Sequence, residues 1–185
     1  FLKFDLPATL GSDLAGVVVE VGNKVTRFKP GDAVFASTFD SGVGSLSEFA
    51  VVAESAAAPK PTSLDFVQAA SIPMVGLTSW QALKERANLK AGQKVFIPAG
   101  SGGVGTFAIQ LAKHLGATVG TTTSTANIDL VRSLGADEAG RDLASQPAFH
   151  VKGTVIQQAL RRLRHRRQLV QRDRDALDSR GRGFG

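Results

Sequence analysis

Cysteine and tyrosine are both absent from this chain of 185 residues, which has 11 Phe, one Trp and one Met. Without cysteine the chain cannot form disulfides, bind zinc through thiolates or use a cysteine nucleophile. Nothing in the composition therefore indicates an oxidising compartment, and we expect a cytoplasmic protein. Hydrophobic residues make up 43% and charged residues 21%, which is an ordinary globular composition with enough apolar material for a core.

Long apolar runs are also missing. No stretch approaches the roughly 20 consecutive apolar residues that a membrane-spanning helix needs, and the first residues lack the basic-then-apolar pattern of a signal peptide. The sequence predicts a soluble protein without a membrane partner. Its first residue is Phe1 rather than Met, so we expect an upstream segment to be missing.

Positive charge is concentrated at one end. Residues 151–185 hold ten of the 22 Lys and Arg side chains and three Asp, which leaves the rest of the chain close to neutral. We interpret 146–185 as a disordered or aberrant tail, such as an out-of-frame end, because it has many arginines and few aromatic residues. The alternative is a non-enzymatic protein that binds nucleic acid or acidic membranes through this tail.

Short β-type runs separated by turn residues fill the first third of the chain. Glycine in the Pro-Gly turn would supply the positive φ of a type II turn, and Gly-Asn suits a tight hairpin. The pattern predicts an antiparallel, barrel-like region over residues 1–60. Its predicted strands and turns are Val17–Val21, Gly22-Asn23, Val25–Phe28, Lys29–Asp32, Ala33–Phe35 and Phe49–Val52.

From Pro61 onward the pattern becomes α/β. Two helical stretches precede an apolar strand, an amphipathic helix, a second strand and a second helix, and two glycines follow these helices where a C-terminal glycine is expected. Alternation of strand and helix predicts part of a doubly wound parallel sheet over 61–145. The predicted elements are Leu64–Ala70, Met74–Ala87, Val95–Ile97, a helix with the apolar face Val104, Phe107, Ala108, Leu111 and Leu115 before Gly116, the strand Thr118–Thr122, and a helix capped by Ser124 before Gly135.

A glycine-rich turn joins the first predicted strand to its helix. Its sequence is Pro98-Ala99-Gly100-Ser101-Gly102-Gly103-Val104-Gly105, which contains G-x-G-x-x-G. We assign Gly100 to the tight turn, Gly102 to close approach of a pyrophosphate and Gly105 to helix packing. The helix N-terminus would receive the phosphates. A flexible loop is the plain alternative, but the strand–turn–helix context favours dinucleotide binding.

The second strand ends without a carboxylate. NAD-preferring sites place an acidic residue roughly 20 residues after the glycines, where it binds the ribose 2′-OH. Here the chain has Thr121–Thr125, whose hydroxyls could bind a 2′-phosphate. We therefore favour NADP, while the alternative is that these residues are ordinary strand-end and capping threonines.

Several segments together resemble the medium-chain dehydrogenases/reductases, in particular the zinc-independent quinone oxidoreductase and enone reductase branch. The resemblance covers Phe1 to about Glu138 and implies part of a GroES-like domain followed by part of a Rossmann domain. It rests on Gly11–Gly16, Val18, Val21-Gly22, Phe28–Asp32, Pro73–Trp80, Ala99–Gly105, Gln110, Lys113 and Leu134–Asp137.

The resemblance also implies a metal-free site. Zinc-containing relatives have a His-Glu pair where this chain has Ser12-Asp13, and they have a four-cysteine lobe that this chain cannot build. The three histidines are scattered along the chain, so we expect no metal ligands.

By resemblance, the activity is hydride transfer from NADPH to a quinone or an α,β-unsaturated carbonyl, and intact relatives are expected to be homo-oligomers. Thr78 would contact the nicotinamide end, although a helix hydroxyl bonded to its own backbone is the plain interpretation. Ser124 would bind the 2′-phosphate, and Asn127 stands where many relatives have a lysine. The candidate cofactor-binding residues are Thr78, Gly100, Ser101, Gly102, Gly103, Val104, Gly105, Thr123, Ser124 and Asn127.

Beyond Glu138 the resemblance ends, and no further strands of the family are recognisable in the sequence. The chain identifies no proton donor. Because the nicotinamide half of such a site is built from later strands, we expect residues 1–185 to show little or no turnover.

Overall fold

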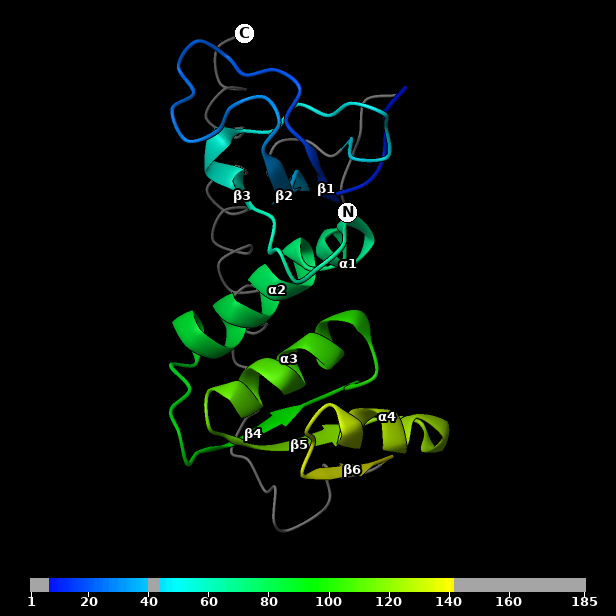
Figure 1. Ribbon diagram of the computed structural model, residues 1–185. Coiled ribbons are helices and arrows are strands. Elements are labelled where there is room, and N and C mark those ends of the chain that lie inside the picture. The colour runs from blue at the N-terminus through cyan, green and yellow to red at the C-terminus, as the bar shows by residue number, and fades with distance from the viewer. Residues whose placement is uncertain (1–6, 40–43, 142–185) are drawn as a thin grey trace, which may run out of the picture. The chain divides into compact units, whose positions relative to one another are not determined.

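A computed structural model describes residues 7–39 and 44–141. These residues fall into two compact units, which divide after Thr78. The first unit contains an antiparallel sheet and the second a parallel sheet (Figure 1). Both parts of the predicted fold class are therefore confirmed. The predicted tail at 146–185 lies outside the described residues.

The sheet of the first unit has the strand order β1-β2-β3, with both pairs antiparallel. β1 (Asp13–Val17) pairs with β2 (Ala33–Ser37) from Asp13 opposite Ser37 to Val17 opposite Ala33, and β3 (Ala57–Pro59) covers the other edge of β2. The predicted turn before β2 is confirmed, because Gly31 has a φ of +94° and the Asp32 N–H donates to the Lys29 carbonyl at 3.1 Å.

Three of the predicted strands are wrong. The first strand begins at Asp13 and ends at Val17, and neither Val18–Phe28 nor Phe49–Val52 is in a strand. Their alternating apolar residues suit a sheet, but beyond the two backbone bonds that join Val18 to Gly31 and Asp32 they pair with no neighbouring strand among the described residues. A strand forms only where its backbone groups have partners.

Two helices and a π-helical turn follow the antiparallel sheet. α1 (Phe66–Ala70) begins with a capping box, in which Asp65 accepts the Gln68 N–H and the Gln68 side chain accepts the Asp65 N–H. α2 (Pro73–Trp80) has proline at its first position, where no backbone N–H is needed. The π-helix η3 (Gln81–Arg86) continues α2. Both predicted helical stretches are helical: Leu64–Ala70 begins two residues later than predicted, and Met74–Ala87 begins and ends one residue earlier.

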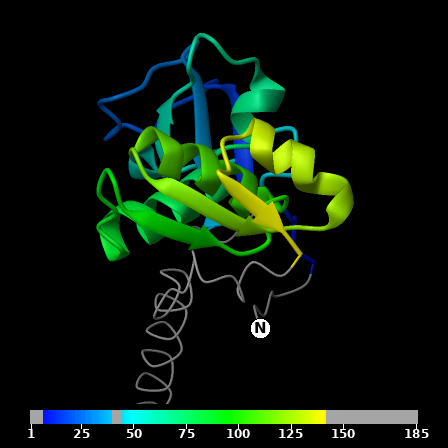
Figure 2. The same ribbon diagram turned by 90° about the horizontal axis from the view of Figure 1, so that it is seen from below.

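The second unit is built on the parallel strands β4 (Lys94–Ile97), β5 (Thr118–Thr122) and β6 (Glu138–Gly140), in that order. The parallel register of Lys94–Ile97 on Thr118–Thr121 is confirmed. β6 pairs with β5 at the edge of the sheet (Figure 2). This third strand is not recognisable in the sequence, because Glu138–Gly140 is too short and too rich in small residues to show an apolar strand pattern.

Helices α3 (Gly103–His114) and α4 (Ile128–Ser133), with the 3-10 turn η4 (Thr125–Asn127) before α4, connect the parallel strands (Figure 1). Gly116 and Gly135 follow them with φ of +80° and +106°, as predicted for C-terminal glycines. The predicted apolar face of α3 is partly wrong, because Val104 is exposed. The side that packs against β4 and β5 consists of Gly105, Ala108, Ile109 and Ala112.

The core of the second unit is formed by the strands and the inner sides of these helices. Side chains at most 1% exposed include Leu83, Val95, Ile97, Ile109, Val119 and Val131. Leu83 comes from η3, so the π-helical turn contributes a buried side chain to this core.

Candidate functional site

The glycine-rich turn leads from Ile97, the last residue of β4, to Gly103, the first residue of α3. Its left-handed residue is Ala99, with a φ of +54°, while Gly100 has no positive φ. The tight turn that the sequence assigned to Gly100 is therefore made by Ala99. An L-residue in this region is uncommon and strained.

Two glycines are required by packing. A Cβ on Gly100 would overlap Thr121 Oγ1 and reach Ile109 at 3.0 Å. A Cβ on Gly105 would overlap the Ala99 carbonyl oxygen and lie 2.7 Å from Gly100 Cα. Gly105 thus lets α3 approach the end of β4, as its spacing predicts, whereas Gly100 makes room for a side chain of β5.

Gly102 is different, because it is exposed and a Cβ there would meet only the Ala99 carbonyl oxygen, at 3.3 Å. Its own N–H donates to that oxygen at 3.0 Å, and its carbonyl accepts the first helical bond, from Thr106. Within the described residues, the N–H groups of the next three residues have no hydrogen-bond partner. These residues are Gly103, Val104 and Gly105.

Three backbone donors at the start of a 12-residue helix form a region of positive potential. The small exposed residue Gly102 lets an anion approach them closely. This arrangement can hold a phosphate or pyrophosphate group.

Three consecutive threonines at the carboxyl end of β5 contact this turn, and the sequence predicted none of these contacts, although it named Thr123 as a candidate cofactor-binding residue. We refer to Thr121, Thr122 and Thr123 as the threonine triplet. Thr123 is 8% exposed, and its hydroxyl donates to Ser101 Oγ at 2.8 Å. The sequence feature that could have indicated these contacts is the unbroken run of hydroxyl side chains at a strand end. Such a run does not by itself specify a hydrogen-bond partner.

Ser124 and Asn127 follow the triplet. Ser124 is exposed at the start of η4 and makes no side-chain capping bond, so its predicted capping role is wrong. Asn127 precedes α4 without a capping bond either. The reason is that η4 intervenes between the strand and α4, which begins at Ile128. Both polar side chains consequently remain available at the carboxyl end of the sheet.

Thr78 belongs to the first unit, whereas the other candidates belong to the second. Its hydroxyl oxygen lies 4.0 Å from Met74 Sδ, so the interpretation that it bonds its own backbone is wrong.

The start of the same helix is held by Asp13, because the Met74 N–H donates to Asp13 Oδ1 at 2.6 Å. The sequence assigned no role to Asp13, since its partner lies 61 positions later in the chain.

Asp137 connects two elements of the second unit, α3 and β5. Lys113 Nζ donates to both of its carboxylate oxygens, at 2.8 and 2.9 Å, and the Val119 N–H donates to Oδ2 at 2.6 Å. Burial raises the pKa of Asp137, but the Lys113 ammonium and the Val119 N–H outweigh it, so this pKa lies below its usual value. The carboxylate thereby fixes the C-terminal end of α3 to the start of β5, at the edge of the sheet opposite the glycine-rich turn.

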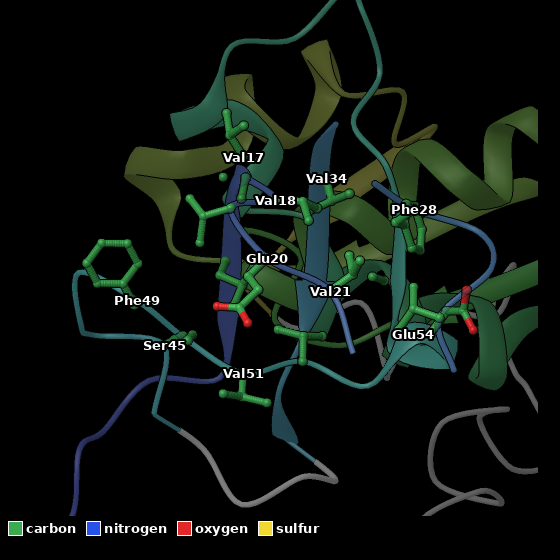
Figure 3. A pocket seen from close by; sticks show the side chains of 18 of the residues that line it. Val17, Val18, Glu20, Val21, Phe28, Val34, Ser45, Phe49, Val51 and Glu54 are labelled. Atoms are coloured by element: carbon green, nitrogen blue, oxygen red, sulfur yellow. The ribbon is translucent and has the colours of Figure 1, made fainter. Parts of the chain in front are cut away.

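A cavity of about 720 Å³ lies within the first unit. Figure 3 shows valines of its wall, with Phe28, Phe49 and the carboxylates of Glu20 and Glu54. Glu54 accepts the N–H groups of Thr26 and Arg27, and these backbone bonds from Arg27 and Thr26 lower the pKa of Glu54. No reactive group converges there, so the cavity offers apolar surface rather than chemistry.

Over residues 7–39 and 44–141, no three His, Cys, Asp or Glu side chains gather closely enough to hold a metal ion. In the same ranges no helix is both long and apolar enough to cross a bilayer.

Comparison with protein families matches residues 2–62 to the alcohol dehydrogenase GroES-like domain. The chain is 46% identical over 138 residues to the mouse protein NAD(P)H oxidoreductase RTN4IP1, mitochondrial, covering 72% of this chain and 35% of the relative. It is 44% identical over 142 residues to NADPH-dependent alkenal/one oxidoreductase, chloroplastic, of Arabidopsis thaliana, covering 72% and 36%.

Among solved structures, the chain resembles the quinone oxidoreductase from Coxiella burnetii, with a TM-score of 0.70 and 36% identity. That match covers 80% of this chain and 47% of the solved chain. The chain therefore spans about a third of the length of the two curated relatives and under half of the solved one.

Proposed function

The chain belongs to the medium-chain dehydrogenase/reductase superfamily, and from this premise we propose that it is part of an enzyme that transfers hydride from NADPH to a quinone or an α,β-unsaturated carbonyl. A quinone is itself a conjugated unsaturated ketone, so the two substrate classes present the same electron-poor carbon. The names of the alkenal/one oxidoreductase and of the quinone oxidoreductase support this substrate class.

The start of α3 is the observation that carries the proposal. It has three unpaired backbone donors, a left-handed turn that directs the chain into the helix, and Gly102 exposed beside them. Strand β4 precedes this turn and β5 lies parallel to it, which is the context of a dinucleotide-binding turn. We assign the cofactor's pyrophosphate to the residues Gly100, Ser101, Gly102, Gly103, Val104 and Gly105.

NADPH is proposed over NADH because β5 ends in hydroxyl side chains. Thr123 and Ser124 occupy the place where a carboxylate would repel a 2′-phosphate. Ser124 is exposed and free of a capping bond, and Asn127 adds an amide donor one 3-10 turn later. We assign the 2′-phosphate to Ser124 and Asn127. Thr78 is proposed to contact the nicotinamide end, on family resemblance.

When bound, the nicotinamide supplies the hydride. The residues of this chain bind and orient the cofactor: the α3 amides hold the phosphates, and Ser124 and Asn127, which follow β5, hold the ribose end. No protein group in the described residues is assigned as the proton donor, and we propose solvent as the source of the proton.

Binding of the cofactor tests the proposal directly. NADPH is titrated into residues 1–185 and its fluorescence or the heat of binding is followed, with NADH as the comparison. We expect NADPH to bind more tightly, and we expect Gly102→Asp to abolish binding because it places a carboxylate beside the free amides. Ser45→Ala in the first unit is the matched control. Equal NADPH affinity in wild type and Gly102→Asp would contradict the assignment.

Turnover is expected to be small for residues 1–185. A dinucleotide site is built across two βαβαβ halves, and the described parallel sheet, with three strands, is equivalent to one of them. NADPH oxidation is followed by absorbance with a simple quinone and a short enone. Steady oxidation that Gly102→Asp abolishes would show that this chain carries a working substrate site.

A further inference from the structure

The glycine-rich turn depends on a residue in an unfavourable conformation. Ala99 has a φ of +54° although it is not glycine, and this region is unfavourable for an L-residue because its Cβ comes too close to the following carbonyl oxygen. Such a conformation persists only where the surroundings determine it. The contacts of Ala99 therefore decide the shape of the turn.

Thr122 supplies two of these contacts. Its side-chain Oγ1 accepts the Ala99 N–H at 3.1 Å, and its backbone carbonyl accepts the Gly100 N–H at 2.8 Å. Held in this way, Ala99 presents its own carbonyl to the Gly102 N–H at 3.0 Å. The side chain of Thr122 thus acts through Ala99 on the residue that opens the helix.

The other two members of the triplet hold the turn on either side. The hydroxyl of Thr121, which is fully buried, donates to the Ile97 carbonyl at 2.6 Å. The hydroxyl of Thr123 donates to Ser101 Oγ at 2.8 Å. The end of β5 therefore holds the turn at three places: before Ala99, at Ala99 and after it. Each threonine lies 22 to 24 positions from its partner in the chain.

We propose that the threonine triplet positions the glycine-rich turn for the pyrophosphate, and that Thr122 sets nucleotide affinity by holding Ala99 in the left-handed conformation. These are positioning residues, since they act through the turn and not on the cofactor. The inference rests on the proposed function for its ligand, but its geometric part can be measured without any ligand.

Hydrogen exchange tests the geometric part on residues 1–185. Thr122→Val keeps the branched shape of the side chain and removes the acceptor of the Ala99 N–H. We expect exchange of the Ala99 and Gly102 amides to become at least about tenfold faster, because their local opening becomes easier. Thr118→Val is the matched control: it lies on the same strand, and its hydroxyl makes no hydrogen bond within the described residues.

Affinity tests the functional part. We expect Thr122→Val to raise the Kd for NADPH about tenfold, which corresponds to the loss of one hydrogen bond and the order that it maintains. Thr122→Ser retains the hydroxyl and should stay within about threefold of wild type. Adenosine 2′-phosphate lacks the pyrophosphate, so Thr122→Val should leave its affinity unchanged, whereas general loss of structure would weaken both ligands.

The outcomes separate the two proposals. Unchanged exchange at Ala99 and Gly102 in Thr122→Val overturns the inference whether or not NADPH binds. An equal loss of affinity for both ligands also overturns it. Wild-type protein that binds no nucleotide overturns the proposed function, while exchange still decides whether Thr122 holds the turn. Should Thr122→Val not fold, Thr123→Val, which removes only the Ser101 contact, decides the question: exchange of the Ser101 and Gly102 amides is expected to be faster than in wild type, and unchanged exchange overturns the inference.

Discussion

At the scale of single residues, the glycines of the turn differ in what a side chain would meet. Gly105 faces the backbone of Ala99 and Gly100, whereas Gly102 faces open space apart from one carbonyl oxygen. The same residue type therefore serves packing at one position and ligand access at the other, and the two uses are separable by substitution.

We predict that Gly105→Ala lowers the free energy of unfolding by about 1–3 kcal/mol, because the added Cβ forces the turn and α3 apart. Gly102→Ala should change it by less than about 1 kcal/mol, since its φ of −79° suits any residue, but should weaken NADPH binding. Urea unfolding and NADPH titration of both variants check this. Equal destabilisation by the two substitutions would contradict the packing argument.

Asp137 is expected to make stability depend on pH. Its pKa is lowered in the folded protein, so its contribution is present above the unfolded pKa of about 3.9 and is lost as pH falls through the folded value. Urea midpoints measured from pH 7 to pH 3 should fall more steeply for wild type than for Asp137→Asn. Parallel curves would show that Lys113 and Val119 do not favour the charged form.

At the scale of elements, the start of α2 depends on a distant strand. The Met74 N–H is one of the first amides of this helix, and its acceptor is Asp13 on β1. Capping is usually supplied by the residue just before a helix. Here Pro73 occupies the first position, and a carboxylate from the sheet takes the capping role.

We predict that Asp13→Ala destabilises the protein by about 1 kcal/mol, as loss of a helix cap does. Asp13→Asn retains an acceptor oxygen and should recover most of that loss. Thermal unfolding of the two variants gives the comparison. If Asn is as destabilising as Ala, the carboxylate charge and not the hydrogen bond is what matters.

At the scale of the whole molecule, most of the exposed large apolar side chains among residues 7–39 and 44–141 belong to the first unit. Val19, Phe49 and Val51 are 64%, 73% and 96% exposed, and all three line the cavity of this unit. They belong to the segments that have a strand pattern but no strand partner. Unpaired backbone beside apolar side chains promotes association between molecules.

We predict that residues 1–185 bind a hydrophobic dye such as ANS and aggregate at modest concentration. Phe49→Ser combined with Val51→Ser should reduce both effects with little change in Tm, because neither side chain is packed. Val34→Ser is the contrasting variant and should lower Tm, since Val34 is buried in β2. A similar fall in Tm for the double variant would show that Phe49 and Val51 are packed in solution.

The sequence alone determined those features that depend on neighbours along the chain. The Pro30-Gly31 turn, the helix-ending glycines Gly116 and Gly135, and the strand–glycine turn–helix unit around Gly102 follow from backbone preference and local periodicity. Parallel pairing of β4 with β5 follows as well. A helix that connects two neighbouring strands of one sheet returns the chain to the end where the first strand began, so the second strand runs in the same direction.

Only the tertiary structure decided which distant groups meet. It determined that Asp13 caps α2, that Ala99 makes the left-handed turn, and that Thr122 holds it. It also left Phe49–Val52 unpaired despite its strand pattern. The physical reason is that a hydroxyl, a carboxylate or an extended backbone can bond many partners, and the choice among them is made by whichever element the folded chain brings within about 3 Å.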